Sequence, residues 1–269
     1  MRNCDEEFSP IALSRELSAL SLDGVSLNFF DVTDSTNRQA RLALESGSIG
    51  EGTALFIADK QTKGRGRFDR RFDSDSGVGI YMSLVTSVSD WFSDGALLTV
   101  LAAVAAAEAV EELSGARVDI KWVNDLYISG KKLAGILCEG IVSPETSRLE
   151  RAIIGIGVNV YKRDFGKELS EIATDIESAA KKRISRARLS AKITKNILDG
   201  IASYKKEELV EKYKARSFLG GKRVKVTRGN ESYFATVVDV NLHAELVVKK
   251  DDGTVEALSS GEVSVIAEE

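Results

Sequence analysis

A basic stretch interrupted by glycines, residues 60–72, restricts the folds open to this chain. It follows an apolar run at 53–58 that is typical of a buried strand, and a second apolar run follows at 78–85. The stretch itself has neither a helical nor a strand period, so it predicts a loop between two buried strands. Six of its side chains are Lys or Arg, and such a loop repels itself unless an anion lies among them.

The residue types of this loop suit a small anionic ligand. Arginine offers a planar fork of donors to carboxylate or phosphate oxygens, and glycine lets the backbone approach a ligand closely. A solvated surface loop or an RNA-binding patch has a similar composition, so the loop alone leaves these interpretations open. A phosphate-binding P-loop is excluded, because the glycine spacing differs and no helix follows.

The composition narrows the class of protein. The 269 residues are 43% apolar, which supports a sizeable core, and the net charge of −4 disfavours a general nucleic-acid binder. Two cysteines, Cys4 and Cys138, and one histidine, His243, cannot build a disulfide framework or a Cys/His metal cluster. No apolar run is long enough to span a membrane and no signal sequence is present, so we expect a cytoplasmic protein.

The order of apolar patterns predicts two parts. Strands are expected at 25–32, 53–58, 78–85, 118–123, 126–128, 133–142 and 151–160. Helices are expected after 34–37, at 96–113 and over much of 165–217. From residue 222 short alternating strands follow one another, which indicates a small barrel. We therefore predict a larger domain at 1–218 and a small β-domain at 219–269.

Polar residues at a predicted helix start form a second candidate site. Ser35, Thr36 and Asn37 stand where a helix N-terminus can accept an anion or a polar ring, although plain helix capping explains them equally well. Gln61 ends the preceding strand with both a donor and an acceptor.

A third candidate lies in an otherwise apolar hairpin. Lys121, Asn124 and Asp125 interrupt it, and polar groups in such a place need partners. Lys132 heads the next strand, where its ammonium either enters a pocket or stays on a charged hairpin shoulder. Strict strand alternation puts Gly135 on the opposite face from Lys132, so that Gly135 contributes only backbone to a shared pocket.

The fourth candidate is a strand with small residues on one face. Gly155, Gly157 and Asn159 alternate along it and leave room beside the sheet, which the Asn159 amide could line. Close packing of the backbone against a neighbour is the other interpretation.

In this order and spacing, the four stretches resemble the biotin protein ligases (biotin–[acetyl-CoA-carboxylase] ligases). The family's pattern is Ser-Thr-Asn at a helix start, Gln-x-x-Gly-Arg-Gly-Arg, Lys-Trp-Pro-Asn-Asp with a hairpin Lys-Leu-x-Gly, and Gly-x-Gly-x-Asn. The corresponding segments here are Ser35-Thr36-Asn37, Gln61-Thr62-Lys63-Gly64-Arg65-Gly66-Arg67, Lys121-Trp122-Val123-Asn124-Asp125, Lys132-Leu133-Ala134-Gly135 and Gly155-Ile156-Gly157-Val158-Asn159. The match covers roughly residues 28–160, and the family also has a small C-terminal barrel.

The resemblance implies a fold and a reaction. The fold would be α/β (α+β), a mixed central β-sheet flanked by helices like the class II aminoacyl-tRNA synthetase core, with an SH3-like C-terminal β-barrel. The enzyme would use biotin, ATP and Mg²⁺ to form biotinyl-5′-AMP. It would then transfer biotin to a lysine of a biotin carboxyl carrier protein or domain. The metal ligands stay unknown.

The resemblance also implies roles for individual residues, with Lys132 and Arg67 as the catalytic cations. The residues expected to bind biotin are Ser35, Thr36, Asn37, Gln61, Gly64, Arg65, Gly66, Arg67, Lys132, Gly135 and Gly157. The residues expected to bind ATP are Arg65, Arg67, Arg70, Phe72, Lys121, Asn124, Lys132 and Asn159.

Three positions depart from the family's pattern. Asp69 stands where the family has Gly, Phe72 where it has Trp, and Val123 where it has Pro. Asp69 adds a negative charge to the loop, and Phe72 keeps a stacking face but lacks the indole donor.

Two alternatives remain, a lipoate–protein ligase of the same superfamily and a non-catalytic RNA-binding or ligand-binding relative. The residues before 25 are too few for the DNA-binding domain of some family members, so we expect no operator binding. A homodimer through an exposed strand edge is compatible with the sequence.

Overall fold

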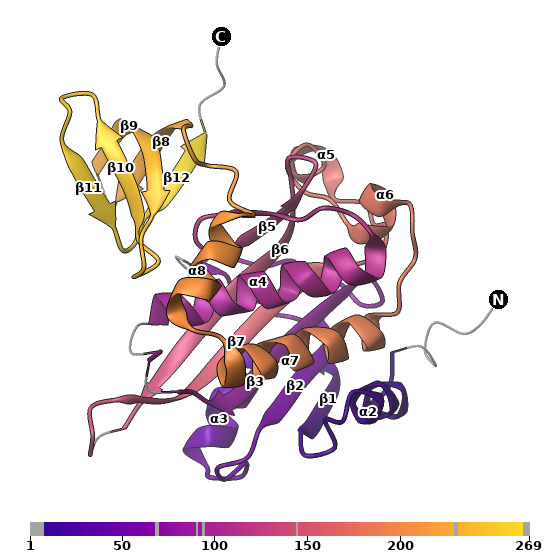
Figure 1. Ribbon diagram of the computed structural model, residues 1–269. Coiled ribbons are helices and arrows are strands. Elements are labelled where there is room, and N and C mark those ends of the chain that lie inside the picture. The colour runs from indigo at the N-terminus through magenta and orange to yellow at the C-terminus, as the bar shows by residue number, and fades with distance from the viewer. Residues whose placement is uncertain are drawn as a thin grey trace.

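A computed structural model of the chain describes residues 8–67, 70–89, 91–92, 95–143, 145–228 and 231–265 (Figure 1). Its centre is a seven-stranded sheet with the order β1-β2-β3-β7-β6-β5-β4. The β1 and β2 strands are parallel and the other neighbours are antiparallel, so the predicted mixed sheet is confirmed. The strands are β1 (Ser26–Thr33), β2 (Ala54–Gln61), β3 (Gly79–Ser87), β4 (Asp119–Lys121), β5 (Asp125–Ile128), β6 (Lys131–Val142) and β7 (Leu149–Asn159).

Helices cover both faces of this sheet because its inner strands are apolar on both sides. On β2, Leu55 and Ile57 belong to the main core, whereas Ala54 and Phe56 pack in a smaller cluster with Ala40. Ala40 lies on α3 (Thr36–Glu45), so α3 covers one face of the sheet. Helices α4 (Gly95–Ser114) and α7 (Arg186–Ser203) cover the other face.

The long helix α4 is buried almost all round, as its alanine-rich sequence predicts. It packs against the sheet, α7 and α8 (Lys206–Lys214). Gly200 of α7 makes this close packing possible, because a Cβ there would lie 2.5 Å from Cδ1 of Leu101. The predicted helical region at 165–217 contains α5 (Gly166–Leu169), α6 (Ile176–Ala180), α7 and α8, and the chain before β1 forms α2 (Pro10–Ala19).

The C-terminal part is a separate five-stranded antiparallel sheet with the order β11-β10-β9-β8-β12. Its strands are β8 (Arg223–Arg228), β9 (Glu231–Val240), β10 (Leu246–Lys250), β11 (Val255–Leu258) and β12 (Glu262–Val265). These strands confirm the predicted series of short strands from residue 222 onward. The pairings recorded for the described residues do not join β11 to β12, so closure into an SH3-like barrel stays a prediction.

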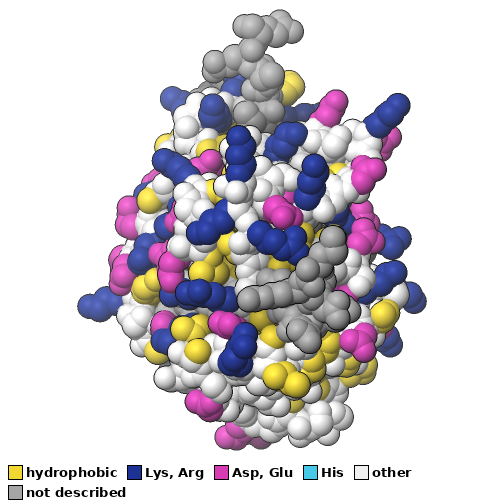
Figure 2. Space-filling view, turned by 90° about the vertical axis from the view of Figure 1, so that its right-hand side faces the viewer, with side chains coloured by type: hydrophobic (Ala, Val, Ile, Leu, Met, Phe, Trp, Pro, Cys, Tyr) yellow, Lys and Arg dark blue, Asp and Glu magenta, His cyan; other side chains and the backbone are white. Residues whose placement is uncertain are grey.

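Charged side chains of both signs are intermixed on the face shown in Figure 2, where Lys and Arg lie among Asp and Glu. A uniformly basic surface of the kind used for nucleic acids is not seen on this face. Among the described residues, no helix is both long and apolar enough to cross a membrane.

Candidate active site

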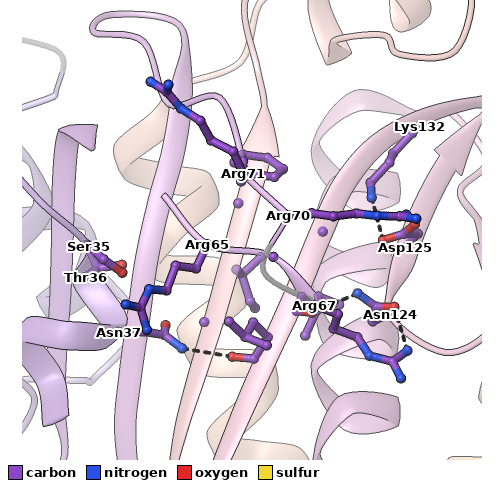
Figure 3. Close-up of a pocket in the computed structure, with 18 of the residues that line it drawn as sticks. Ser35, Thr36, Asn37, Arg65, Arg67, Arg70, Arg71, Asn124, Asp125 and Lys132 are labelled. Atoms are coloured by element: carbon purple, nitrogen blue, oxygen red, sulfur yellow. Dashed lines mark hydrogen bonds and ion pairs between the residues drawn. The ribbon is translucent and has the colours of Figure 1, made fainter. Parts of the chain in front are cut away.

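One pocket gathers residues from four of the predicted stretches (Figure 3). It lies where β2, β5, β6 and β7 meet the start of α3 and the basic loop, and two residues of the C-terminal sheet region also reach it. Its lining consists of Ser35, Thr36, Asn37, Gln61, Arg65, Gly66, Arg67, Arg70, Arg71, Phe72, Met82, Lys121, Trp122, Asn124, Asp125, Lys132, Gly135, Ile136, Leu137, Gly155, Ile156, Gly157, Gly261 and Val263.

The start of α3 forms a neutral polar end of the pocket. Ser35 is the N-cap residue, yet its hydroxyl caps no backbone N–H of the helix. Its own N–H instead donates to Asp34 Oδ1 at 2.7 Å. Plain capping therefore does not explain the Ser35 hydroxyl, which lines the pocket.

Asp34 stabilises this helix start as an ionised group. Burial alone would raise the pKa of its carboxyl, but hydrogen bonds from Arg38, Gln39 and the Ser35 N–H outweigh burial and lower the pKa to about 2. The carboxylate also lies at the positive end of the helix dipole.

Gln61 connects this helix start to the base of the basic loop. Its Oε1 accepts from the Thr36 N–H at 2.8 Å, and its Nε2 donates to Ser74 Oγ at 3.0 Å. Ser74 Oγ in turn donates to the Phe72 carbonyl at 3.0 Å. The Gln61 side chain thus fixes the position of the start of α3 relative to the basic loop.

The basic loop is a narrow hairpin in its described part. The Phe72 N–H donates to the Gly64 carbonyl at 3.0 Å, and the Gly66 N–H donates to the Arg70 carbonyl at 2.7 Å. Gly64 is required by space, because a Cβ there would lie 2.4 Å from the Phe72 carbonyl oxygen. Asp69, the departure from the family's pattern, lies outside the described residues.

The ring of Phe72 lies on a surface formed by two glycines. Gly135 and Gly157 are paired between β6 and β7. A Cβ at Gly157 would come within 2.6 Å of the Phe72 ring, whereas one at Gly135 would lie 3.5 Å away. Tyr81 contacts the same ring edge-to-face, with centroids 6.3 Å apart. Gly157 of the fourth candidate stretch, together with Gly135, therefore makes room for the Phe72 ring.

The opposite end of the pocket is cationic. Lys132 Nζ lies 2.7 Å from Asp125 Oδ1, and Arg67 donates to Asn124 Oδ1 at 3.3 Å. In Figure 3 the side chain of Arg70 extends to the side of Asp125 and Lys132. Among the described lining residues, six are Lys or Arg and one, Asp125, is acidic, so the site attracts anions.

The position of Lys132 corrects the expectation from strict alternation. The β5–β6 pairing passes from Leu126 with Ala134 to Tyr127 with Lys132, so Leu133 is an extra, bulged residue. The bulge reverses the alternation, and Lys132 lines the pocket together with Gly135. A Cβ on Gly135 would lie 3.8 Å from Lys132 Cε, which confirms that they share a face.

Two predicted site residues are not in the pocket lining. Gly64 is buried within the loop hairpin, where its carbonyl accepts from the Phe72 N–H. Asn159 is buried and its amide donates to the Thr174 carbonyl at 3.1 Å, which ties β7 to the segment before α6. A role of Asn159 in nucleotide binding stays a prediction.

Other lining residues had no binding role assigned from the sequence. Asp125 and Gly155 were named in the third and fourth candidate stretches, and both line the pocket. Arg71 is part of the basic loop, but Figure 3 shows its side chain turned away from Lys132 and Asp125. Gly261 and Val263 come from a part of the chain more than a hundred residues away, and no local pattern marks them.

Comparison with known proteins agrees with this geometry. The model of the biotin/lipoate A/B protein ligase family matches residues 29–159, and that of the biotin protein ligase C-terminal domain matches 219–265. The biotin–[acetyl-CoA-carboxylase] ligase of Mycobacterium tuberculosis is 30% identical over 241 residues, covering 86% of this chain and 85% of the relative. The chain therefore belongs to the biotin protein ligase family.

Two further relatives place it within this family. The bifunctional ligase/repressor BirA of Bacillus subtilis is 44% identical over 166 residues, or 61% of this chain. The match spans only half (50%) of that relative's length. The structure of the Aquifex aeolicus biotin protein ligase in complex with biotin and ATP superposes with a TM-score of 0.74 at 28% identity, covering 90% of this chain and 99% of that one.

Proposed function

We propose that this chain is an ATP-dependent biotin protein ligase. A carboxylate oxygen of biotin would attack the α-phosphorus of ATP, forming biotinyl-5′-AMP and releasing pyrophosphate. A lysine amine of a biotin carboxyl carrier protein or domain would then attack the acyl carbon, and AMP would leave. The Aquifex relative was solved with both biotin and ATP, which supports these two substrates.

The observation that carries the proposal is a single pocket with two chemically different ends. Thr36 and Gln61 at one end offer neutral hydrogen bonds, which suit an uncharged polar ring. Arg67 and Lys132 at the other end offer positive charge, which suits a carboxylate and phosphates. Biotin has both a neutral ureido ring and a carboxylate at the end of an apolar chain.

Lys132 is suited to bring two anions together. Its ammonium has three donors and forms an ion pair with Asp125 Oδ1 at 2.7 Å. The side chain is 38% exposed, so a carboxylate and a phosphate oxygen can both reach it. Such a preorganised cation is worth most where negative charge develops during transfer.

Arg65, Gly66 and Arg67 would close over the reacting groups. Water would hydrolyse the mixed anhydride, so a cover over the adenylate is needed until the acceptor lysine arrives. The loop's short hairpin and its glycines allow its backbone to approach a ligand closely. Phe72 offers an apolar face for the ligand.

Mg²⁺ is compatible with the residues present. It usually binds one or two protein carboxylates and completes its shell with phosphates and water. Asp125 is the carboxylate that fits among the described lining residues, and no group of three or more metal-binding side chains was found in the described part of the chain. With ATP bound, the ion would offset part of the phosphate charge.

Further features belong to the same proposal. We place the domain division at 1–218 and 219–269, which the C-terminal family match at 219–265 supports. A carboxyl carrier domain as partner, a cytoplasmic location, a homodimer and the lack of operator binding stay predictions.

The test is pyrophosphate release from ATP by the purified protein, with biotin and lipoate supplied in separate reactions. Release with biotin alone, followed by labelling of a carrier domain, is the expected result. Release with lipoate alone would assign the chain to the lipoate ligases. No release with either, together with salt-sensitive RNA binding, would favour the non-catalytic alternative.

A further inference from the structure

A largely buried ion pair joins the start of α7 to β2, and neither partner is among the described residues that line the pocket. Arg186 Nη1 donates to Asp59 Oδ1 at 2.7 Å and to the Gly79 carbonyl at 3.1 Å. The ring of Phe8 covers the guanidinium, with the ring centroid 4.0 Å away. The Arg186 side chain is only 5% exposed. A buried ion pair is often no more stabilising than apolar residues of similar volume, so stability alone gives no reason for an arginine here.

The carboxyl group of Asp59 stays ionised although most of it is buried. Burial by itself would raise the pKa of this carboxyl. Hydrogen bonds from Ser76 and Arg186, the charge of Arg186 and a hydrogen bond from the Gly77 N–H outweigh burial and lower the pKa below its ordinary value. Asp59 is therefore a charged acceptor, and Arg186 of α7 fixes its place.

The same carboxylate holds the chain that leads from the basic loop back to β3. We call residues 72–78 the return arm. The Gly77 N–H donates to Asp59 Oδ1 at 3.1 Å, and the Ser76 hydroxyl donates to Asp59 Oδ2. Hydrogen bonds to a charged acceptor are stronger than those between neutral groups. Asp59 is thus an anchor that ties the return arm to β2.

The return arm carries a residue of the pocket. It begins with Phe72, whose ring lies against Gly157. Gln61 holds the arm at Ser74, and Asp59 holds it again at its far end. Only three residues separate Phe72 from Ser76, so the place of the Phe72 ring depends on both attachments.

We propose that Asp59 and Arg186 are positioning residues for the basic loop. Arg186 keeps Asp59 charged and in place, and Asp59 holds the return arm that carries Phe72. Neither residue touches the ligand. The inference rests on the proposed function, in which the loop covers biotinyl-5′-AMP and keeps water away. A weaker anchor should therefore increase the loss of the adenylate, while the cations that promote its formation stay in place.

The test measures adenylate loss separately from carrier labelling. Without a carrier, turnover requires that biotinyl-5′-AMP leave the site or be hydrolysed to biotin and AMP, so steady AMP formation reports the loss. Ser76→Ala should raise this rate by about 3- to 10-fold, because an exposed residue gives up one hydrogen bond to a charged group. Labelling of a carrier domain at saturating biotin and ATP should stay close to wild type. Ser76→Thr keeps the hydroxyl and should restore the wild-type loss.

A double variant removes the whole anchor without leaving an unpaired buried charge. Asp59→Leu/Arg186→Met should keep a Tm close to wild type, since apolar residues often replace a buried ion pair without loss of stability. Its adenylate loss should rise by at least about 10-fold. The control is Ser48→Ala, which removes another exposed hydroxyl, bonded to the Ala43 carbonyl at 3.2 Å, and should keep the wild-type loss.

Two outcomes would overturn the positioning role. One is a wild-type rate of adenylate loss in the double variant, and Ser76→Ala decides the matter if the double variant does not fold. The other is a lower rate together with a lower Tm, which is the result of a purely structural role.

Trypsin tests the anchor independently of the reaction. The basic loop offers cleavage sites after Arg65, Arg67, Arg70 and Arg71, and cleavage of a folded protein depends on local opening. Ser76→Ala and the double variant should both be cut in this loop about 3- to 10-fold faster than wild type. Unchanged cleavage would overturn the anchor. Faster cleavage in the variants, with no biotin-dependent pyrophosphate release by the wild type, would overturn the proposed function and leave the anchor standing.

Discussion

Replacing Gly155 by alanine should damage the site and the fold together. Gly155 lies on β7 beside the start of α3, and a Cβ there would lie 2.1 Å from Asn37 Oδ1 and 2.9 Å from the Leu137 carbonyl oxygen. Neither neighbour can move freely, since Asn37 is held by Ser83 and Glu139 and the carbonyl belongs to β6.

The magnitude follows from two costs. Forcing a methyl group into a packed site costs about 1–3 kcal/mol, and expelling the Asn37 amide from its buried hydrogen bonds costs about 1–3 kcal/mol more. The free energy of unfolding should therefore fall by about 2–6 kcal/mol, which lowers Tm by roughly 4–24 °C for a chain of this size. Biotin affinity should fall as well, because Thr36 loses its fixed neighbour.

Urea denaturation and calorimetry measure these two effects. The matched control is Gly140→Ala on β6, where a Cβ would meet only the terminal methyl of Leu149 at 2.5 Å. That side chain can turn away, so we expect a loss below about 1 kcal/mol. A loss for Gly155→Ala no larger than that of the control would refute the reasoning.

Three more predictions concern single side chains. Lys132→Ala should reduce biotin-dependent pyrophosphate release by at least about 100-fold, while Tm stays almost unchanged because a partly exposed ion pair is worth about 0–1 kcal/mol. The control Lys131→Ala should keep full activity. Wild-type activity in Lys132→Ala would exclude the catalytic role of Lys132. The pKa of Asp34 is lowered from 3.8 to about 2, so its stabilisation is present above pH 3.8 and is lost as the pH falls toward 2. The stability difference between wild type and Asp34→Asn, about 1 kcal/mol after solvent screening, should therefore shrink over that range in urea titrations, and a constant difference would contradict the assignment. Burial raises the pKa of Cys138 to about 12, so its thiol should resist iodoacetamide in the folded protein at pH 8 and react after unfolding, as mass spectrometry of a Cys4→Ser variant would show.

Most of the sheet could be predicted because its strands are marked locally. The apolar runs at 53–58 and 78–85 became β2 and β3, and the alanine-rich run became α4. These patterns reflect burial on one or both faces, which the residues of each segment determine by themselves. Their order in the sheet depends on pairing between distant segments, which no local pattern records, and the family resemblance implied only that the sheet is mixed and flanked by helices.

The site was predictable where its chemistry is carried by motif residues. Thr36, Gln61, Arg67 and Lys132 all line the pocket. Ser83 was missed because it stands as an ordinary polar residue in an apolar strand. Its importance comes only from two contacts with residues 46 and 47 positions away.

The bulge at Leu133 shows why strand alternation alone misplaces Lys132. Leu133 and Ala134 are adjacent, yet both are fully buried in the main core, which an unbroken strand does not allow for neighbouring side chains. Because Leu133 takes an extra place in the strand, Lys132 is released from the core face and lies beside Gly135 in the pocket. An ammonium under α4 would have no water and no anion, and its burial would be costly. The extra residue therefore satisfies two demands at once: it fills the core with Leu133 and directs the charge of Lys132 to the face where an anion can bind.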